Sequence, residues 1–137
     1  KDWPVLAKMD SKFSAIGGCV PERMGLGPVV AIKKIFSSDW CTLDDFDVIE
    51  TNEAFAAVVL AQQKEFELVK HNFGRLSPEK VNRNGGAIAL GHPISASGAR
   101  LVLTCAKELE LTGATIGLVT LCVGGGQGVA ACLERSN

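Results

Sequence analysis

The sequence predicts an α/β domain built on a mostly parallel sheet with helices on both of its faces. Apolar segments with strand-like and helix-like patterns alternate along the chain, and glycine-rich stretches separate them. This alternation favours a parallel sheet, because each crossover helix packs against one face of it. The 137 residues are 47% hydrophobic and 21% charged, which suits one hydrophobic core and a single domain over residues 1–137.

The first part of the chain carries two predicted strands with a helix between them. An opening strand is expected within residues 5–16. Apolar residues at helical spacing then predict a helix over about residues 28–38, and Pro28 takes the first helical position, where a missing N–H costs nothing. The short apolar run 47–50 is the second strand.

The next helix is predicted to begin at Asn52 and to continue through an alanine-rich segment to Phe66. Asn52 is a favoured N-cap residue, and the Glu53 carboxylate would face the positive end of the helix dipole. The polar stretch 70–80 is predicted as a surface connection that leads into the segment 81–86, which is rich in asparagine and glycine.

The last third of the chain predicts a long helix followed by a hairpin. The helix covers about residues 95–110 and stops before Gly113. Two apolar strands, 115–122 and 128–133, follow with a glycine turn between them, so one strand of the sheet is antiparallel. The resulting order is βαβαβαββ. One apolar face of the long helix is formed by Leu101, Val102, Cys105 and Leu109.

Charge and hydropathy exclude several classes of partner. Fourteen Lys+Arg against fifteen Asp+Glu give a formal net charge of -1, which leaves no basic surplus for nucleic acid or an anionic membrane surface. The longest apolar run, residues 54–61, is far shorter than the roughly 20 residues that span a bilayer, and the first residues form no signal-peptide core. We therefore expect a soluble cytoplasmic protein with no nucleic acid and no membrane partner, although a eukaryotic organelle is not excluded.

The cysteine and histidine content argues against disulfides and metals. The five cysteines are an odd number and contain no Cys-x-x-Cys pair at zinc spacing. The two histidines, His71 and His92, stand far apart in different surroundings. We therefore predict neither a disulfide framework nor a metal site.

Three polar residues at predicted strand-to-loop junctions are candidates for chemistry. Asn52 is either a plain N-cap or an amide aimed at a ligand oxygen. His92, between a glycine and a proline, is either a structural histidine or one held at a loop tip for catalysis. Cys122 is either an inert core thiol or a reactive one, since four glycines within residues 124–128 offer N–H groups as oxyanion donors. Together the three would suit acyl transfer.

Longer motifs around these residues resemble a known family. Asn52-Glu53-Ala54-Phe55-Ala56 is the first, and Cys122-Val123-Gly124-Gly125-Gly126-Gln127-Gly128 is the last. Between them stands Asn82-x-Asn84-Gly85-Gly86-Ala87-Ile88-Ala89-Leu90-Gly91-His92-Pro93, which continues to Ala96-Ser97-Gly98-Ala99-Arg100. In this order they resemble the signature segments of the C-terminal domain of the thiolase family. With Pro21-x-x-Met24-Gly25-x-Gly27-Pro28, which resembles the stretch before that domain's first helix, the match runs from about residue 4 to residue 134.

The resemblance implies a three-layer α/β/α domain with a five-stranded mixed sheet. It also implies acyl transfer between acyl-CoA and CoA, either as thiolysis of a 3-ketoacyl-CoA or as Claisen condensation of acetyl-CoA. The coenzyme A thioester would be the substrate, with no separate cofactor. Such an enzyme would be a homo-oligomer, a dimer or a tetramer, when complete.

Site residues follow from the same resemblance. By position, His92 would activate a nucleophilic cysteine and bind a thioester oxygen, while Asn52 would hold a water in the same oxyanion hole. Cys122 would act as acid and base at the α-carbon, and the Gly124 N–H would serve a second oxyanion hole. The acyl or pantetheine pocket would be lined by Met24 and Phe55.

The sequence departs from the family pattern in two respects. Ser95 stands where the family usually has glycine, so a helix-capping side chain enters a crowded region. The chain is also about one third of a thiolase, and the half that carries the nucleophilic cysteine and the CoA-binding loop domain would have to be supplied in cis or in trans. A non-catalytic thiolase-like module for assembly or acyl-CoA binding is the alternative. A ketosynthase-type condensing enzyme is disfavoured, because Asn52-Glu53-Ala54-Phe55 is the thiolase pattern.

Overall fold

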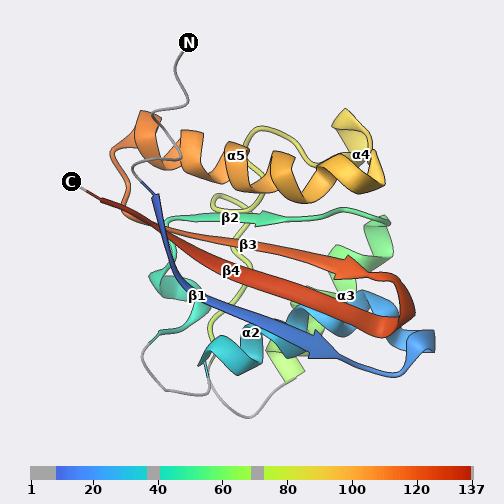
Figure 1. The fold of residues 1–137 in the computed structure, drawn as a ribbon. Helices are drawn as coiled ribbons and strands as arrows, with labels where there is room; N and C mark the ends of the chain where they lie inside the picture. The colour runs from blue at the N-terminus through green and yellow to red at the C-terminus, as the bar shows by residue number, and fades with distance from the viewer. Residues whose placement is uncertain (1–8, 37–40, 69–72, 137) are drawn as a thin grey trace.

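The computed structural model describes residues 9–36, 41–68 and 73–136, and these form a three-layer α/β/α arrangement around one mixed sheet (Figure 1). The strands are β1 (Met9–Gly18), β2 (Val48–Thr51), β3 (Ile116–Val123) and β4 (Gln127–Arg135), and they lie in the order β1-β4-β3-β2. β2 and β3 are parallel, whereas β4 is antiparallel to both β1 and β3. The expected single antiparallel strand is thus confirmed.

The helices cover the two faces of the sheet. They are α2 (Gly27–Phe36), α3 (Ala56–Leu68), the single turn α4 (Ala87–Leu90) and α5 (Ile94–Thr112). In Figure 1, α5 lies along one face, and α2 and α3 lie on the other side. Within the described ranges, no helix combines the length and the apolar character that a membrane crossing needs.

Strand alternation divides the apolar residues into two cores. Val48 and Val119 point toward α5, while their neighbours Ile49 and Leu118 point toward α2. On the α5 side, the predicted helix face is confirmed, because the residues at spacings of four are fully buried. These are Leu101, Cys105 and Leu109. Burial of each such leucine side chain stabilises the fold by roughly 1.5–3 kcal/mol.

The expected fifth strand is wrong, because the described part of the sheet has four strands. At the edge beyond β2, where a strand before the long helix would lie, Val81 forms only an isolated parallel bridge with Ile49. Asn82 then adopts a positive φ of 46°, which turns the chain out of extended geometry. The apolar run that follows forms the short helix α4 instead of extending the sheet.

The N-cap prediction for Asn52 is also wrong, since α3 begins only at Ala56. The backbone N–H of Asn52 instead donates to the carbonyl of Thr120 at 3.0 Å, so the chain follows β3 beyond the end of β2. The C-terminal ends of two other helices agree better with the prediction. α5 ends at Thr112, and Gly113 follows it with the left-handed φ of 71° that a helix-ending glycine supplies. The first helix ends at Phe36 within the described residues, and the predicted positions 37 and 38 lie outside them.

Candidate active site

The candidate residues gather where β2 and β3 end. Parallel strands place their carboxyl ends at the same edge of a sheet, where α/β proteins commonly bind ligands. Thr51 pairs with Thr120, so Asn52 comes one residue beyond the pair on β2, and Cys122 two residues beyond it on β3. The sequence reaches this edge a third time at His92, between α4 and α5.

Asn52 and His92 are in direct contact across this edge. Asn52 Nδ2 lies 3.4 Å from His92 Nε2. Asn52 is completely buried, whereas His92 is exposed. The Asn52 side-chain oxygen, Oδ1, is also buried and has no hydrogen-bond partner in the described structure. A buried amide oxygen of this kind is available to a donor that the described residues do not supply.

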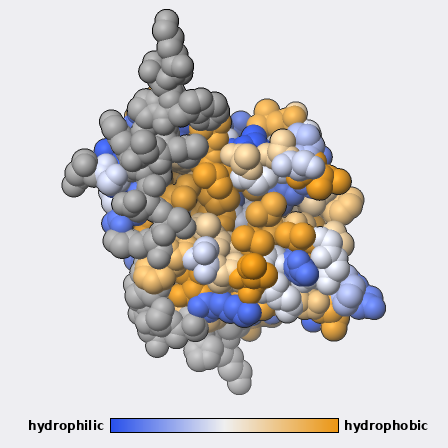
Figure 2. Space-filling view, in the orientation of Figure 1, coloured by the Kyte–Doolittle hydropathy of each residue, from blue (hydrophilic) through white to orange (hydrophobic). Residues whose placement is uncertain are grey.

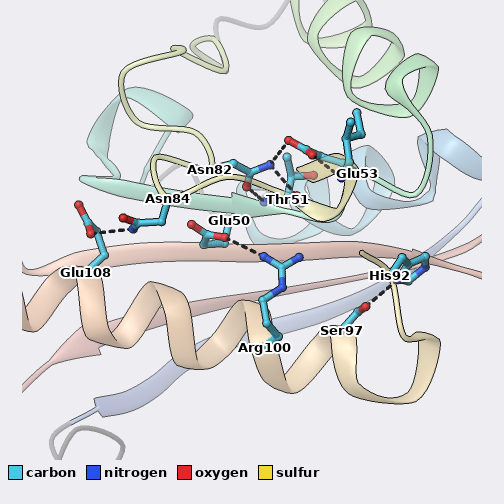
Figure 3. Close-up of polar contacts among 10 residues, drawn as sticks. Glu50, Thr51, Glu53, Asn82, Asn84, His92, Ser97, Arg100 and Glu108 are labelled. Carbon is cyan, nitrogen blue, oxygen red and sulfur yellow. Dashed lines mark hydrogen bonds and ion pairs between the residues drawn. The ribbon is translucent and has the colours of Figure 1, made fainter. Parts of the chain in front are cut away.

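Hydrogen bonds to Ser97 assign the tautomer of His92. The Ser97 hydroxyl donates to the carbonyl of Pro93 at 3.2 Å, and Ser97 Oγ lies 2.6 Å from His92 Nδ1 (Figure 3). Since the hydroxyl hydrogen is used, Oγ accepts from Nδ1–H, and Nε2 carries the lone pair that faces Asn52. An imidazole that carries no proton on Nε2 is the form that acts as a general base at that nitrogen.

Cys122 is half-buried near the end of β3. Burial raises the pKa of its thiol, so the sulfur holds its proton at neutral pH. Along β3, Leu118 faces α2 and Val119 faces α5, and this alternation directs Cys122 to the α2 side. No hydrogen bond joins Cys122 to His92 or Asn52 within the described ranges, so the structure brings the latter two together but does not connect the thiol to them.

The glycines after Cys122 serve two different purposes. A Cβ on Gly126 would lie 2.3 Å from the carbonyl oxygen of Cys19, and one on Gly128 would lie 2.0 Å from the carbonyl carbon of Gly27. These two positions therefore need glycine for close backbone packing. At Gly124, by contrast, an added Cβ meets nothing within 4 Å. Close packing therefore does not require glycine at position 124, and open space lies beside its backbone.

The two residues expected to line an acyl or pantetheine pocket do share a pocket. Its volume is about 390 Å³, and Met24 and Phe55 both line it. It lies between α3 and the 3-10 helix η1 (Pro21–Leu26), which precedes α2. Phe55 is 63% exposed, so a bound chain would cover apolar area that is now in contact with solvent. This pocket lies on the same side of the sheet as the Cys122 side chain.

Sequence reasoning missed two residues of this region, Ser97 and Asn82. Ser97 is 1% exposed on α5 and holds the His92 ring, and Asn82 bonds to the backbone on one side of Asn52. Both lie inside recognisable motifs, but no local pattern states which side chain they contact. Ser95, the departure noted above, is exposed in the first turn of α5 and does not cap it, because the N-cap is Pro93.

The fold and these motifs define a thiolase-type α/β domain, and comparisons with known proteins agree. Residues 4–135 match the family described as "Thiolase, C-terminal domain". The chain therefore belongs to the thiolase family.

Among characterised relatives, the chain is 51% identical over 124 residues to an acetyl-CoA acetyltransferase of Chromobacterium violaceum, which covers 90% of this chain and 30% of that protein. It is 46% identical over 132 residues to a 3-ketoacyl-CoA thiolase of Aliivibrio fischeri, covering 96% of this chain and 32% of that protein. The crystal structure of the Bacillus anthracis acetyl-CoA acetyltransferase superposes with a TM-score of 0.82 at 42% identity, covering 93% of this chain and 30% of that one. The chain thus spans about a third of the length of the relatives it matches.

Proposed function

We propose that this chain is the catalytic C-terminal domain of an enzyme that transfers acyl groups between acyl-CoA and CoA. The observation that carries the proposal is the 3.4 Å contact between Asn52 Nδ2 and the lone pair of His92 Nε2, beside the end of the strand that holds Cys122. The nucleophilic cysteine of the family would come from an N-terminal half, in cis or in trans. A homo-oligomer with the coenzyme A thioester as substrate, and with no resident cofactor or metal, completes the proposal.

In thiolysis, the absent cysteine would attack the 3-keto carbon of the substrate with its thiolate. Nε2 of His92 accepts the proton that this thiol loses. The bond between C2 and C3 then breaks, and the electron pair stays on C2. Cys122, protonated because burial raises the pKa of its thiol, delivers its proton to that carbon. The resulting thiolate takes the proton of the incoming CoA thiol, whose sulfur attacks the carbonyl carbon of the acyl-enzyme. The bond from that carbon to the nucleophilic sulfur then breaks, and the departing thiolate takes back the proton from His92 Nε2.

The oxyanion formed at each stage needs hydrogen-bond donors that are already in place before the charge develops. In this proposal, Asn52 and His92 serve the first oxyanion hole, the asparagine through a held water. The Gly124 N–H serves the second. Removal of a single such donor typically lowers kcat by about 100- to 1,000-fold.

Replacement of Cys122 tests the assignment in the complete protein that carries this chain. We expect Cys122→Ala to abolish both thiolysis and condensation, because one sulfur performs the proton transfers of both directions. Cys41→Ala is the matched control, since Cys41 is a buried thiol outside the site and should be replaced with little loss of activity. Retention of both reactions by Cys122→Ala would refute the role.

A non-catalytic module that binds acyl-CoA is the second candidate, and the pocket at Met24 and Phe55 is the observation that favours it. Calorimetry of this chain with CoA and acetyl-CoA distinguishes the two functions. Tight binding by the chain alone would favour the module. Catalytic activity of the complete protein would favour the enzyme. We propose the cytoplasm as its compartment, supported by the 50% identical relative of Rattus norvegicus that is named as cytosolic.

A further inference from the structure

The backbone on one side of Asn52 is held by the side chain of Asn82. Asn82 Oδ1 accepts from the Thr51 N–H at 3.0 Å, and Asn82 Nδ2 donates to the Thr51 carbonyl, also at 3.0 Å. One amide side chain thus satisfies both backbone groups of the last residue of β2, as a neighbouring strand would. Asn82 itself is fixed at its positive φ by the bond from its N–H to the carbonyl of Ile49 at 2.9 Å.

The other side of Asn52 is held by Glu53, which connects three segments. Glu53 Oε1 accepts from Asn82 Nδ2 at 2.9 Å, and Glu53 Oε2 accepts from the Ile88 N–H at 3.0 Å (Figure 3). Ile88 belongs to α4, which directly precedes the loop that carries His92. The carboxylate therefore ties the Asn52 loop to the His92 loop through Asn82 on one side and α4 on the other.

The Glu53 carboxylate packs closely against Gly86. A Cβ on Gly86 would lie 2.0 Å from the carboxyl carbon of Glu53 and 2.2 Å from each carboxylate oxygen. Only glycine leaves room for Glu53 at this place, and its requirement comes from the Glu53 carboxylate and not from backbone strain, since Gly86 has a φ of -105°.

We propose that Glu53 and Asn82 are positioning residues that fix the distance between Asn52 and His92. This inference rests on the proposed acyl-transfer function of the pair. Among the hydrogen bonds of the described residues, neither side chain contacts His92; Asn82 acts through the backbone of Thr51, and Glu53 acts through Asn82 and the Ile88 N–H. A displacement of about 1 Å between reacting groups can lower a rate by about 100-fold. Glu53 and Asn82, which we call the clamp, therefore affect turnover directly.

The test uses substitutions that keep shape and change hydrogen bonding, made in the complete protein. In Glu53→Gln, whichever way the new amide turns, its NH₂ group meets either Asn82 Nδ2 or the Ile88 N–H, so one of the two bonds is lost. Asn82→Asp tolerates the positive φ and removes the donor to Thr51 and Glu53. The matched control is Asn84→Asp, because Asn84 Nδ2 also donates to a glutamate, Glu108 Oε2, at 2.9 Å, but outside this clamp.

We expect kcat to fall by about 10- to 100-fold in Glu53→Gln and Asn82→Asp, while KM for the acyl-CoA and the activity of Asn84→Asp stay within about twofold of wild type. Gly86→Ala should lower kcat by a similar factor, because the added methyl displaces the Glu53 carboxylate. For the same reason, the double variant Gly86→Ala/Glu53→Ala should be little less active than Gly86→Ala alone. Unchanged kcat in the two clamp variants, or an equal loss in the control, would overturn the proposal.

Crystal structures of the same variants separate this inference from the proposed function. The Asn52 Nδ2 to His92 Nε2 distance, 3.4 Å here, should lengthen beyond hydrogen-bonding range in Glu53→Gln and stay unchanged in Asn84→Asp. An unchanged distance in Glu53→Gln refutes the clamp even if the protein proves inactive. If the wild-type protein transfers no acyl group but the distance does lengthen, the function is wrong and the positioning role stands. Should Asn82→Asp fail to fold, Glu53→Gln alone decides.

Discussion

Glu50 and Arg100 form an ion pair between β2 and α5, with 3.6 Å between Glu50 Oε2 and Arg100 Nη1. The Glu50 side chain is 1% exposed and that of Arg100 is 24% exposed. Neither carboxylate oxygen and neither terminal nitrogen has a hydrogen-bond partner within the described ranges. The pair is therefore under-compensated: the carboxylate has lost its water, and a single cation at this distance replaces only part of it.

This burial predicts a pH-dependent stability. Desolvation raises the pKa of Glu50 from 4.5 to about 7, with smaller increases from Glu108 and Glu53 and an opposing decrease from Arg100. Between these two values the unfolded chain has released the proton and the folded chain still holds it, so the free energy of unfolding falls as pH rises from about 4.5 to about 7 and levels off above that. At 1.36 kcal/mol per pKa unit the loss is at most about 3 kcal/mol.

Glu50→Gln should remove this part of the pH dependence, because the amide does not titrate. Urea unfolding at several values between pH 5 and pH 8 measures it as the difference between wild type and variant. Glu67→Gln, which replaces an exposed glutamate of α3, should leave the wild-type slope unchanged. Equal slopes in wild type and Glu50→Gln would contradict the prediction.

Two adjacent glycines of β1 should respond in opposite ways to a methyl group. A Cβ on Gly17 would lie 2.4 Å from the backbone nitrogen of Ala31 in α2, whereas one on Gly18 meets nothing within 4 Å. Gly17→Ala should therefore destabilise the fold by about 1–3 kcal/mol, because backbone cannot move aside as a side chain can. Gly18→Ala should change stability by less than about 1 kcal/mol, and in the stabilising direction. Equal urea midpoints in the two variants would contradict the close approach of Gly17 in β1 to the backbone of α2.

Local patterns predicted the elements whose determinants lie within one segment. The buried face of α5 follows from apolar spacing, and Gly113 ends that helix at the expected place. The same reasoning failed at Asn52, because the bond that delays α3 comes from the carbonyl of Thr120, a distant part of the chain. Cap preferences describe only the neighbours of a residue and contain no information about such a partner.

The candidate site was predictable as a set of residues and not as a geometry. Asn52 and His92 each had a structural and a functional interpretation, and their contact spans 40 residues of sequence. The N-cap interpretation of Asn52 is now excluded by the start of α3. Asn82 lies in a recognisable motif, but its contacts were not predictable, since they depend on a positive φ and on bonds to Thr51 that only the folded chain reveals.

Exposed apolar side chains predict that this chain associates with itself. Ile88 and Leu90 on α4 are 66% and 60% exposed, and Ile94 at the start of α5 is 81% exposed. Hydrophobic residues are also visible over the strands on the face drawn in Figure 2. A large exposed apolar patch is usually covered in a soluble protein, and the proposed other half would cover these side chains. Light scattering should therefore give a mass that rises with concentration.

Ile94→Lys should reduce this association, because an ammonium at an 81% exposed site opposes burial of the surface around it. Leu68→Lys is the control, since Leu68 is 68% exposed at the end of α3, away from α4. A chain that stays monomeric at high concentration would contradict the predicted self-association. An equal effect of both substitutions would show that the associating surface is not the one at α4 and the start of α5.

The His92 ring should depend on Ser97 for both orientation and tautomer. Ser97 Oγ, 2.6 Å from His92 Nδ1, is the acceptor that keeps the proton on Nδ1 and leaves Nε2 free. Ser97→Ala removes this acceptor without adding bulk to a site that is 1% exposed. The ring can then turn, and the tautomer with its proton on Nε2 becomes available, which cannot accept a proton at that nitrogen. In the complete protein we expect kcat to fall by about 10-fold or more, with little change in KM.

Ser95→Ala separates this effect from a general loss of stability. Ser95 lies two residues earlier in the same helix and is exposed, so its replacement should change neither kcat nor unfolding. Ser97→Ala should also cost about 1 kcal/mol of stability, since a buried hydrogen bond is lost, but a fall in stability does not by itself change the ratio of kcat to KM in the folded enzyme. If kcat in Ser97→Ala stayed at the wild-type value while stability fell, Ser97 would support the helix and not the histidine.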